Sequence, residues 1–579
     1  MSEISNQSIA EILRQIGEYL AMRQEPFKPR AFEKAAETVA SLEEEAGAMY
    51  KSGGVKALKE ISGVGQSIAE IIEELITTGR SKVYEELKKA TPVRLDELAR
   101  VEGLGPKSIQ TLYKKLGVRN LKELEAAAKK GKIAELEGFG KKSEEKILKG
   151  IGFAATAGER SILAGVMPRI AAMKEYLEKV VGVKKVTVAG SARRRRETVG
   201  DIDILAVSSK PSAAMDAFVA MPDVLNVIAH GETKSSIKIR PGINVDLRVV
   251  SEASYGAALN YFTGSKAHNV ALRQIAMKKG MKLNEYGLFK IGSEGKEKII
   301  AGANEEEIYH ALGLDYIEPE LREDTGEIEA AARHTLPKII GYGSLMGDLQ
   351  VQSNWTDGAD SIETMARAAM ARGLKYIAIT DHTKRLAMAH GLDAVRIQQQ
   401  WKEIDAVNKK LAGKIRILKG TECDILKDGS LDLPDEILAK LDVVGVSVHS
   451  FFDMPRAEQT ARVLRAMANP HVDILFHPTG RVINRRPPIE LDIDAIIAAA
   501  KKTKTVMEID ALPERADLKD EHIRKCVEAG VKMAIDSDAH ATVHFDFLED
   551  GIAQARRGWA TKNDIVNAWP VEKMLKQLK

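Results

Sequence analysis

The stretch VKKVTVAGSARRRRETVGDIDILAV, residues 183–207, carries the most specific pattern in the chain. VTVAG is read as a buried strand that ends at Gly190, and IDILAV as a second strand. Because side chains alternate along a strand, Asp201 and Asp203 project from the same face. This pair follows a Gly-Ser turn and four arginines, which distinguishes it from the many Asp-x-Asp pairs without a function.

A third predicted strand, INVDLRVV at residues 243–250, adds Asp246 to the two aspartates. Three carboxylates on one face can hold two Mg²⁺ ions, which activate an attacking hydroxyl and stabilise a leaving pyrophosphate. The Gly-Ser backbone and an arginine would hold the triphosphate. The pattern therefore predicts nucleotidyl transfer, with Asp201, Asp203 and Asp246 as catalytic residues and metal ligands.

Length and composition indicate what kind of protein contains this site. With 579 residues the chain is too long for one hydrophobic core, so several domains are expected. No apolar run approaches the roughly 18 residues of a membrane span, and the polar N-terminus differs from a secretory signal, so we expect a cytoplasmic protein with no membrane partner. Only Cys423 and Cys526 are present, so any further metal must sit on histidines and carboxylates.

Three similar segments occupy the N-terminal part of the chain, ISGVGQSIAEII from Ile61, VEGLGPKSIQTL from Val101 and LEGFGKKSEEKI from Leu136. Each has two glycines in a turn before an amphipathic helix, and such turns can direct backbone N–H groups at a phosphate. This helix-hairpin-helix pattern binds the DNA backbone without reading bases. The predicted DNA-binding residues are Gly63, Gly65, Gly103, Gly105, Lys107, Gly138 and Gly140.

The segment YFTGSKAHNVALRQIAMKKGMKLNEYGLF, from Tyr261, resembles the nucleotide-selecting subdomain of family X DNA polymerases. With the hairpins and the GS…DID pattern, the resemblance extends over residues 1 to about 318. It implies that the three aspartates are the catalytic triad and that Tyr261 and Phe262 line the sugar and disfavour ribonucleotides. The nucleotide-binding residues that it implies are Gly190, Ser191, Arg194, Tyr261, Phe262, Gly264, Asn269 and Arg273.

One position departs from relatives that have 5′-deoxyribose-phosphate lyase activity. Those relatives carry a Schiff-base lysine in the helix after the first hairpin, whereas the matching position here is Ile71, and Ser67 replaces another usual lysine. A Schiff base needs an amine nucleophile. Lyase activity of that type is therefore not expected.

From Leu336 onward, apolar strands alternate with helices, which is typical of a parallel α/β barrel. Barrel active sites collect at the C-terminal ends of strands. Histidines and carboxylates from five strand ends fit phosphoesterase chemistry with three metal ions. The residues at these strand ends are Asp381, His382, Glu422, His449, His477, Asp538 and His540.

This half resembles the PHP (polymerase and histidinol phosphatase) domain, which follows the polymerase core in bacterial and archaeal family X polymerases. The resemblance implies up to three Mn²⁺ or Zn²⁺ ions. A first cluster would use Asp357, His382 and His540, and a second would use Glu422, His449 and His477. The third normally takes two histidines from a His-x-His strand, with Glu422 and Asp538.

The stretch GDLQVQSNWTDG, residues 347–358, departs from that pattern because Gln350 and Gln352 stand at the His-x-His positions. An amide oxygen coordinates a hard ion weakly and does not replace imidazole. Two hypotheses stay open. Either the 3′-5′ exonuclease activity of this domain is lost or weakened, which we expect, or two ions suffice for 3′-5′ exonuclease or abasic-site endonuclease activity.

The predicted organisation is multidomain. We expect an N-terminal helical domain with the first hairpin, a helical DNA-binding subdomain with two more, an α+β nucleotidyltransferase palm, a nucleotide-selecting subdomain, an acidic linker and a PHP domain folded as a distorted TIM-like barrel. The predicted boundaries are, in that order, 1–85, 86–152, 153–255, 256–318, 319–335 and 336–579.

The sequence as a whole predicts a template-directed DNA polymerase that fills short gaps in base-excision or end-joining repair. Its partners would be gapped or primer–template DNA and dNTPs, with other repair proteins as candidates, and we expect a monomer associated with the nucleoid. Transfer to a small molecule or an RNA end is disfavoured by the three hairpins and by YFTGS. A largely non-catalytic DNA-end scaffold is disfavoured by the intact carboxylate triad.

Overall fold

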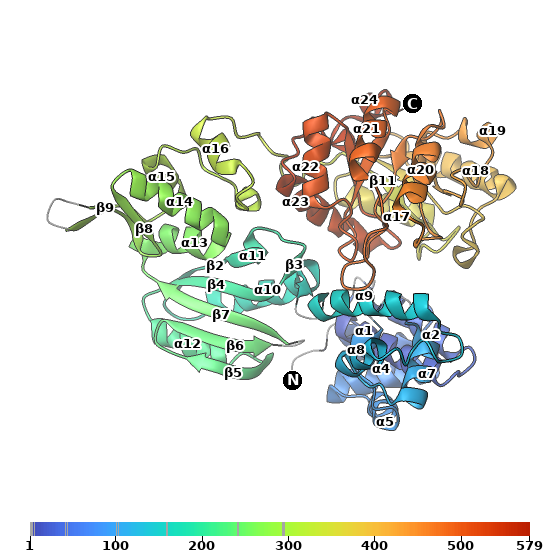
Figure 1. The fold of residues 1–579 in the computed structure, drawn as a ribbon, viewed down its shortest axis with the longest axis horizontal. Coiled ribbons are helices and arrows are strands. Elements are labelled where there is room, and N and C mark those ends of the chain that lie inside the picture. Colours follow the sequence, from blue (N-terminus) through green and yellow to red (C-terminus); the bar gives the residue numbers. More distant parts are fainter. Residues whose placement is uncertain are drawn as a thin grey trace.

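The computed structural model describes residues 4–578 except positions 5, 41, 43, 100, 102–103, 158–159, 240–241 and 292–295. Figure 1 shows the N-terminal helical region beside the C-terminal barrel, with the central sheet and its neighbouring helices on the other side of the molecule. The multidomain fold class expected from the sequence is confirmed. Among the described residues, no helix combines the length and apolar character needed to cross a membrane.

The N-terminal region is helical, and its hairpins repeat one geometry. The N–H of Val64, Leu104 or Phe139 donates to the carbonyl three residues earlier, at 3.0 Å in each case. A cluster of buried apolar side chains runs from Ile9 to Ile151, so the helices share a core. The helices are α1 (Asn6–Met22), α2 (Lys28–Ala40), α3 (Ala46–Leu58), α4 (Gln66–Thr78), α5 (Lys82–Ala90), α6 (Leu95–Leu98), α7 (Pro106–Leu116), α8 (Leu121–Lys129) and α9 (Lys141–Ala157).

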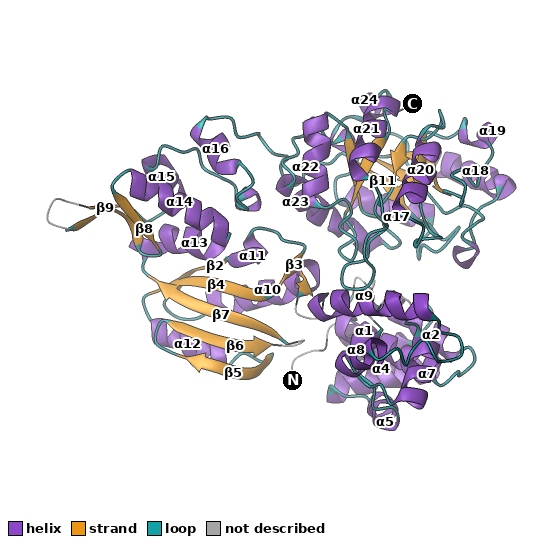
Figure 2. Cartoon of the chain, in the orientation of Figure 1, coloured by secondary structure: helices purple, strands orange, loops and turns teal. Residues whose placement is uncertain are grey.

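The palm is a mixed sheet in which β4 and β7 run parallel at the centre and the outer pairs are antiparallel, in the order β2-β4-β7-β6-β5 (Figure 2). Apolar side chains of α10 and α12 pack with those of the strands in one core. The elements are β1 (Ser161–Ile162), α10 (Leu163–Glu178), β2 (Val183–Val188), α11 (Gly190–Arg193), β3 (Thr198–Val199), β4 (Asp201–Ser208), α12 (Pro211–Val219), β5 (Val224–His230), β6 (Lys234–Ile239) and β7 (Ile243–Val250).

The nucleotide-selecting subdomain continues without a break into the segment that leads to the barrel. That segment was expected to be an acidic linker, yet Arg322 and Glu327 are fully buried in it and Leu321 belongs to the core of the subdomain. The elements are η1 (Glu252–Ser254), α13 (Tyr255–Thr263), α14 (Lys266–Lys278), β8 (Met281–Asn284), β9 (Gly287–Ile291), β10 (Glu297–Ala301), α15 (Glu305–Ala311), η2 (Pro319–Leu321) and α16 (Glu327–Ala332).

The C-terminal domain is a parallel barrel that is nearly closed. Its strands pair in sequence order from β11 to β17, and the N–H of Gln352 donates to the carbonyl of Ala539 at 2.8 Å, which joins the two ends. The strands are β11 (Gly347–Val351), β12 (Tyr376–Ile379), β13 (Arg416–Asp424), β14 (Val443–Ser447), β15 (Ile474–Leu475), β16 (Val506–Asp510) and β17 (Met533–Asp536).

Helices surround this barrel and shield the apolar strands from water. They are α17 (Ile362–Ala371), η3 (Ala387–Ala389), α18 (Ala394–Lys410), α19 (Asp435–Leu438), α20 (Arg456–Met467), α21 (Ile493–Thr503), α22 (Asp520–Ala529), η4 (Thr542–Phe547), α23 (Leu548–Arg557), η5 (Val566–Ala568) and α24 (Val571–Leu575). The expected TIM-like architecture is confirmed.

Candidate active sites

The palm brings its three aspartates to one edge of neighbouring parallel strands. Asp203 on β4 pairs in register with Asp246 on β7, and Asp201 begins β4 at an exposed position. Since residues in register on parallel strands point to the same face, all three carboxylates lie on one side of the sheet.

The negative charges of these aspartates repel one another. Burial, together with the charges of Asp201 and Asp246, raises the pKa of Asp203 to about 6. Burial would also raise the pKa of Asp246, but hydrogen bonds from Ser236 and Lys234 hold it below its usual value, and Lys234 Nζ lies 2.9 Å from Asp246 Oδ2. A divalent cation would relieve the repulsion, so this donor set fits Mg²⁺.

The turn before the aspartates is built around Gly190. Its φ of +62° is favourable only for glycine, and a Cβ added there would lie 2.6 Å from Asp203 Oδ2. Ser191 follows within the short helix α11 and is half-buried. The turn therefore packs directly against the Asp203 carboxylate, which was predicted to be catalytic.

Arg194 is engaged by its own protein. Its Nε donates to Glu323 Oε1 at 3.0 Å, and its Nη1 donates to the Thr263 carbonyl. Gly264 has a φ of +74°, and a Cβ there would lie 3.0 Å from Arg194 Nη1. These contacts connect the predicted triphosphate arginine to the predicted sugar-lining turn.

Three of the remaining predicted nucleotide contacts, Tyr261, Asn269 and Arg273, line a small hollow between α13, α14 and β8. The rings of Tyr261 and Phe262 meet edge to face at 5.1 Å, and the Arg248 guanidinium lies 4.4 Å from the Phe262 ring. Asn269 Nδ2 donates to the Tyr261 carbonyl at 2.7 Å, and Arg273 Nε donates to the Asn269 carbonyl at 3.2 Å.

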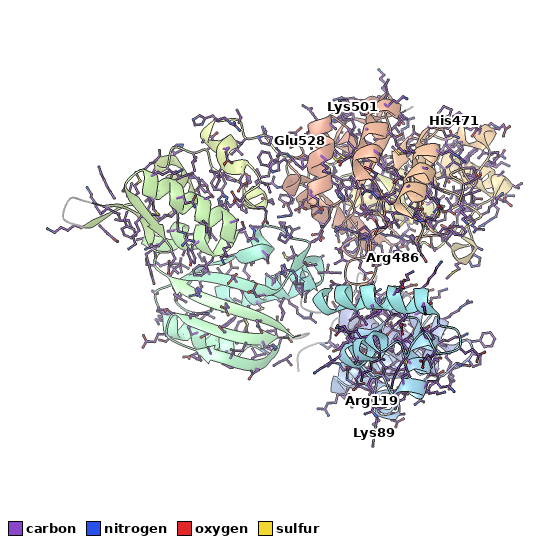
Figure 3. The ribbon with its side chains drawn as sticks, viewed as in Figure 1. Lys89, Arg119, His471, Arg486, Lys501 and Glu528 are labelled. Atoms are coloured by element: carbon purple, nitrogen blue, oxygen red, sulfur yellow. The ribbon has the colours of Figure 1, made fainter. Side chains whose placement is uncertain are left out.

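The predicted DNA-binding glycines stand at the hairpin turns. Gly63 and Gly138 have left-handed φ values of +79° and +86°, while Gly65 and Gly105 cap the helices α4 and α7. Gly140 directly precedes α9, and Lys107 is exposed on α7. Gly103 lies outside the described residues. Figure 3 shows Lys89 and Arg119 on the side of this region that faces away from the barrel. Arg486 lies on the opposite side, between the helical region and the barrel.

The first predicted metal cluster of the barrel is assembled. His382 Nε2 lies 3.4 Å from Asp357 Oδ2, and His540 Nε2 lies 3.7 Å from Asp357 Oδ1. Burial disfavours a charged imidazole, yet the carboxylates of Glu422 and Asp357 raise the pKa of His382 to about 9. One ligand atom from each of Asp357, His382 and His540 lies within 4.8 Å of the others, a spacing that fits a divalent ion.

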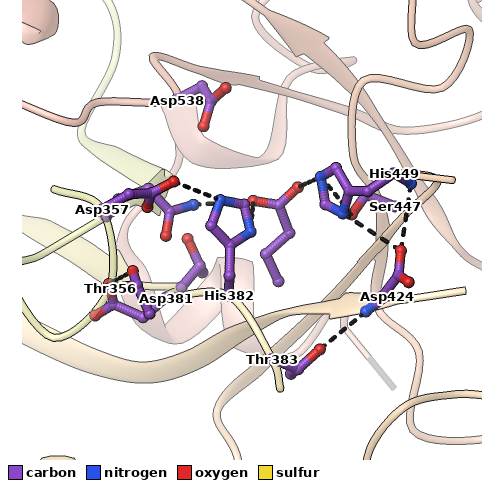
Figure 4. Close-up of polar contacts among 12 residues, drawn as sticks. Thr356, Asp357, Asp381, His382, Thr383, Asp424, Ser447, His449 and Asp538 are labelled. Atoms are coloured by element: carbon purple, nitrogen blue, oxygen red, sulfur yellow. Dashed lines mark hydrogen bonds and ion pairs between the residues drawn. The ribbon is translucent and has the colours of Figure 1, made fainter. Parts of the chain in front are cut away.

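The second cluster centres on Glu422. Its Oε1 lies 3.0 Å from His449 Nε2 and 2.8 Å from His477 Nε2. His449 Nδ1 in turn lies 3.4 Å from Asp424 Oδ1, which orients the ring (Figure 4). Both predicted histidines therefore contact Glu422, but the group whose ligand atoms lie within 4.8 Å of one another there is Glu422, His449 and His382, with His382 Nδ1 at 3.3 Å from Glu422 Oε2.

The third cluster does not fit an imidazole-bound ion. Gln352 Nε2 donates to Glu422 Oε2 at 2.9 Å, so it presents a donor to the carboxylate that would hold the ion. Gln350 is fully buried, and within the described part of the chain both of its amide atoms lack a hydrogen-bond partner. In Figure 4, Asp538 is drawn apart from His382 and His449, whereas its Oδ1 lies 3.8 Å from His540 Nδ1. An amide pair therefore occupies the place of two imidazole ligands.

Comparison with known proteins identifies four regions of the chain. Residues 4–81 match a helix-hairpin-helix domain, 95–152 a SAM-like helix-hairpin-helix tandem, 258–323 the DNA polymerase beta thumb and 348–508 the PHP domain. The DNA polymerase/3'-5' exonuclease PolX of Bacillus subtilis (strain 168) is 40% identical over 563 residues, which cover 97% of each chain. This chain belongs to the family X DNA polymerases that carry a PHP domain. It is a DNA-directed DNA polymerase.

The PHP domain of this family X polymerase also has relatives of its own. A probable phosphatase of Thermoanaerobacter sp. (strain X514) is 30% identical over 217 residues, 36% of this chain and 83% of that protein. A probable phosphatase of Acetivibrio thermocellus is 31% identical over 188 residues, 31% of this chain and 73% of that protein.

Several buried or half-buried residues of this family X polymerase lie beside the predicted ligands but were not predicted from the sequence. Arg515 Nε lies 3.5 Å from Asp510 Oδ2 and 3.8 Å from Asp538 Oδ2. Burial, with the charges of neighbouring carboxylates, raises the pKa of Glu508 and of Asp536 well above its usual value. The spacing of Glu508 and Asp510 along β16, two residues apart, is the one pattern that would have indicated that both face the barrel interior.

Proposed function

We propose that this family X polymerase fills short gaps in DNA by nucleotidyl transfer, with Asp201, Asp203 and Asp246 as the catalytic residues that hold two Mg²⁺ ions. The register of Asp203 opposite Asp246 is the observation that carries the proposal, because it converges the carboxylates on one face. The raised pKa of Asp203 supports it, since burial is the main cause of the shift and the repulsion by Asp201 and Asp246, which a bound cation would relieve, adds to it.

The residues around the triad suggest a division of labour. When bound, the ions would supply Lewis-acid chemistry for the primer hydroxyl and the leaving pyrophosphate. Ser191 and Arg194 would hold the triphosphate, and Tyr261 and Phe262 would line the sugar. The hairpin turns at Gly65, Gly105 and Gly140 would hold the DNA backbone on helix N-termini without reading the bases.

For the PHP domain, we propose that two clusters of residues bind metal ions and that its 3'-5' exonuclease activity is weakened. The convergence of Asp357, His382 and His540, and of Glu422, His449 and His477, supports the two clusters. Gln350 and Gln352 support the loss of the third. An active exonuclease is the second candidate, because the Bacillus subtilis relative is named as one and candidate ligands for two ions lie close together.

One assay separates these functions. Gapped and 3′-tailed DNA would be incubated with Mg²⁺ or Mn²⁺ and the wild-type, Asp203→Ala or His449→Ala chain. We expect efficient gap filling by the wild type, a loss of at least about a thousandfold in Asp203→Ala, and little degradation of the tail. Gln350→His combined with Gln352→His should gain degradation, because it restores imidazole ligands.

Two results would contradict the proposal. Undiminished extension by Asp203→Ala would reject the palm assignment. Robust 3′ degradation that His449→Ala removes and Asp203→Ala leaves intact would favour the active exonuclease.

A further inference from the structure

The four-arginine run after the Gly-Ser turn connects the palm to both of its neighbours. Arg193 pairs with Glu305 of α15, with Nη2 at 2.6 Å from Oε2, and its Nη1 donates to Thr263 Oγ1 at 2.7 Å. Arg195 Nη2 lies 2.9 Å from Asp550 Oδ1 on α23 of the PHP domain. The predicted triphosphate turn is therefore part of a junction between domains.

Arg557, the last residue of α23, reaches the same turn from the PHP side. Its side chain is only 2% exposed. Its Nη1 donates to the Arg194 carbonyl at 2.9 Å and to Glu323 Oε1 at 3.1 Å, and its Nη2 donates to Asp520 Oδ2. One PHP guanidinium thus holds the backbone of the turn and the carboxylate that faces Arg194.

Glu323 Oε1 is shared between the two arginines. It accepts from Arg194 Nε at 3.0 Å and from Arg557 Nη1 at 3.1 Å. Because Arg194 Nη1 also donates to the Thr263 carbonyl, two of its three nitrogens are fixed by protein. Within the described residues, Nη2 has no hydrogen-bond or ion-pair partner, so this nitrogen is free to bind a ligand.

We propose that Arg557 of the PHP domain is a positioning residue for nucleotidyl transfer, acting with Glu323 to orient the Arg194 guanidinium toward the triphosphate of the incoming dNTP. A planar guanidinium that is held at two nitrogens loses little further freedom when its third nitrogen binds phosphate. Without Arg557, Glu323 and the Arg194 backbone each lose a partner, so the guanidinium samples other orientations. The inference rests on the proposed role of Arg194.

A substitution of the neighbouring Arg556 can distinguish a positioning role of Arg557 from a role in holding the domains together. Arg556 lies on the same helix, is also buried and crosses the same junction, but it binds Glu320, with Nε at 2.8 Å from Oε1, and the Ile340 carbonyl, at 2.9 Å from Nη1. Its loss should weaken the junction without releasing Glu323. Arg556→Met is therefore the matched control for Arg557→Met.

The test is steady-state filling of a one-nucleotide gap by the full chain. We expect Arg557→Met to raise the KM for dNTP about tenfold while kcat stays within about twofold, since an orientation is lost but no reacting group. Arg557→Lys should recover part of the loss, because a lysine keeps the charge but lacks the planar fork. Arg556→Met should lower Tm comparably while KM stays unchanged.

Several outcomes would overturn the inference. An unchanged KM in Arg557→Met, or an equal rise in Arg556→Met, would show that Arg557 only joins the domains. If Arg557→Met does not fold, as judged by circular dichroism, Glu323→Gln provides the same test, and an unchanged KM in it rejects the proposal. Arg194→Ala separates the two levels: unaltered KM there rejects the proposed nucleotide contact itself, whereas a raised KM there with normal Arg557→Met kinetics rejects only the positioning role.

Discussion

At the scale of single residues, Gly190 is the position where one methyl group should have the largest effect on the polymerase site. A Cβ would lie 2.6 Å from Asp203 Oδ2, and the φ of +62° disfavours any other residue. Gly190→Ala should displace the Asp203 carboxylate and lower kcat on gapped DNA by about a hundredfold or more, while destabilising the fold by only about 1–2 kcal/mol. Primer-extension kinetics and a thermal melt measure the two effects.

Gly165 provides the control for this substitution. It lies within α10 of the same palm, and a Cβ there would have no atom within 4 Å. Gly165→Ala should leave kcat unchanged and stabilise the helix slightly. Equal activity of the two alanine variants would contradict the close approach of Gly190 to Asp203.

For single residues, the sequence predicted which side chains belong to the sites better than it predicted which residues contact them. The alternation of side chains in β4 was sufficient to place Asp201 and Asp203 on one face, and the absence of imidazoles at Gln350 and Gln352 was visible directly. The partner of Arg194 was not visible, because Glu323 lies 129 positions away and belongs to a segment that looked like a solvated linker. No local pattern encodes such a contact.

At the scale of elements, α1 carries a partly buried carboxyl group that makes the helical region sensitive to pH. Burial, with the nearby charge of Glu11, raises the pKa of Glu18 to about 7. Unfolded Glu18 ionises near 4.5, so the folded state keeps a proton that the unfolded state loses. Stability is therefore full below pH 4.5 and declines as the pH rises toward 7.

Glu18→Gln should remove this dependence. We expect the variant to stabilise the helical region by about 2 kcal/mol at pH 8, after allowance for partial exposure, and to change nothing at pH 4. Hydrogen exchange of the α1 amides, compared with wild type at the same pH, measures the difference. A gain of equal size at both pH values would show that packing, rather than the proton, is responsible.

Elements were the scale at which the sequence was most informative. Period-two patterns predicted β2, β4 and β7, and the repeated Gly-x-Gly turns predicted helices that begin after Gly65, Gly105 and Gly140. The alternation of strands and helices after Leu336 predicted the barrel. The course of the segment from 319 to 335 could not be predicted from the sequence. Its buried charged residues form ion pairs with residues outside the segment, as Arg322 does with Glu305, and no local pattern indicates such a pair.

At the scale of the whole molecule, the nucleotide-selecting subdomain, which matches the polymerase beta thumb, shares an apolar core with the PHP domain. Trp559 of the PHP domain is 7% exposed and belongs to one apolar cluster with Leu321 and Ile328 of the connecting segment and with residues of α14 and α15. Trp559→Ala should therefore cost about 3–5 kcal/mol and loosen both sides of the junction. Hydrogen exchange should show faster exchange in α14–α16 as well as in α22 and α23.

Trp569→Ala tests whether the effect on both domains is specific to position 559 or follows the loss of any buried tryptophan. Trp569 is also 7% exposed, but it packs in the core of the barrel rather than in the shared cluster. Trp569→Ala removes a side chain of the same size, so it should destabilise the PHP domain while leaving exchange in α14–α16 as in the wild type. If both variants loosen only the barrel, the thumb and the PHP domain unfold independently, and the shared apolar cluster contributes no coupling between the polymerase and its C-terminal domain.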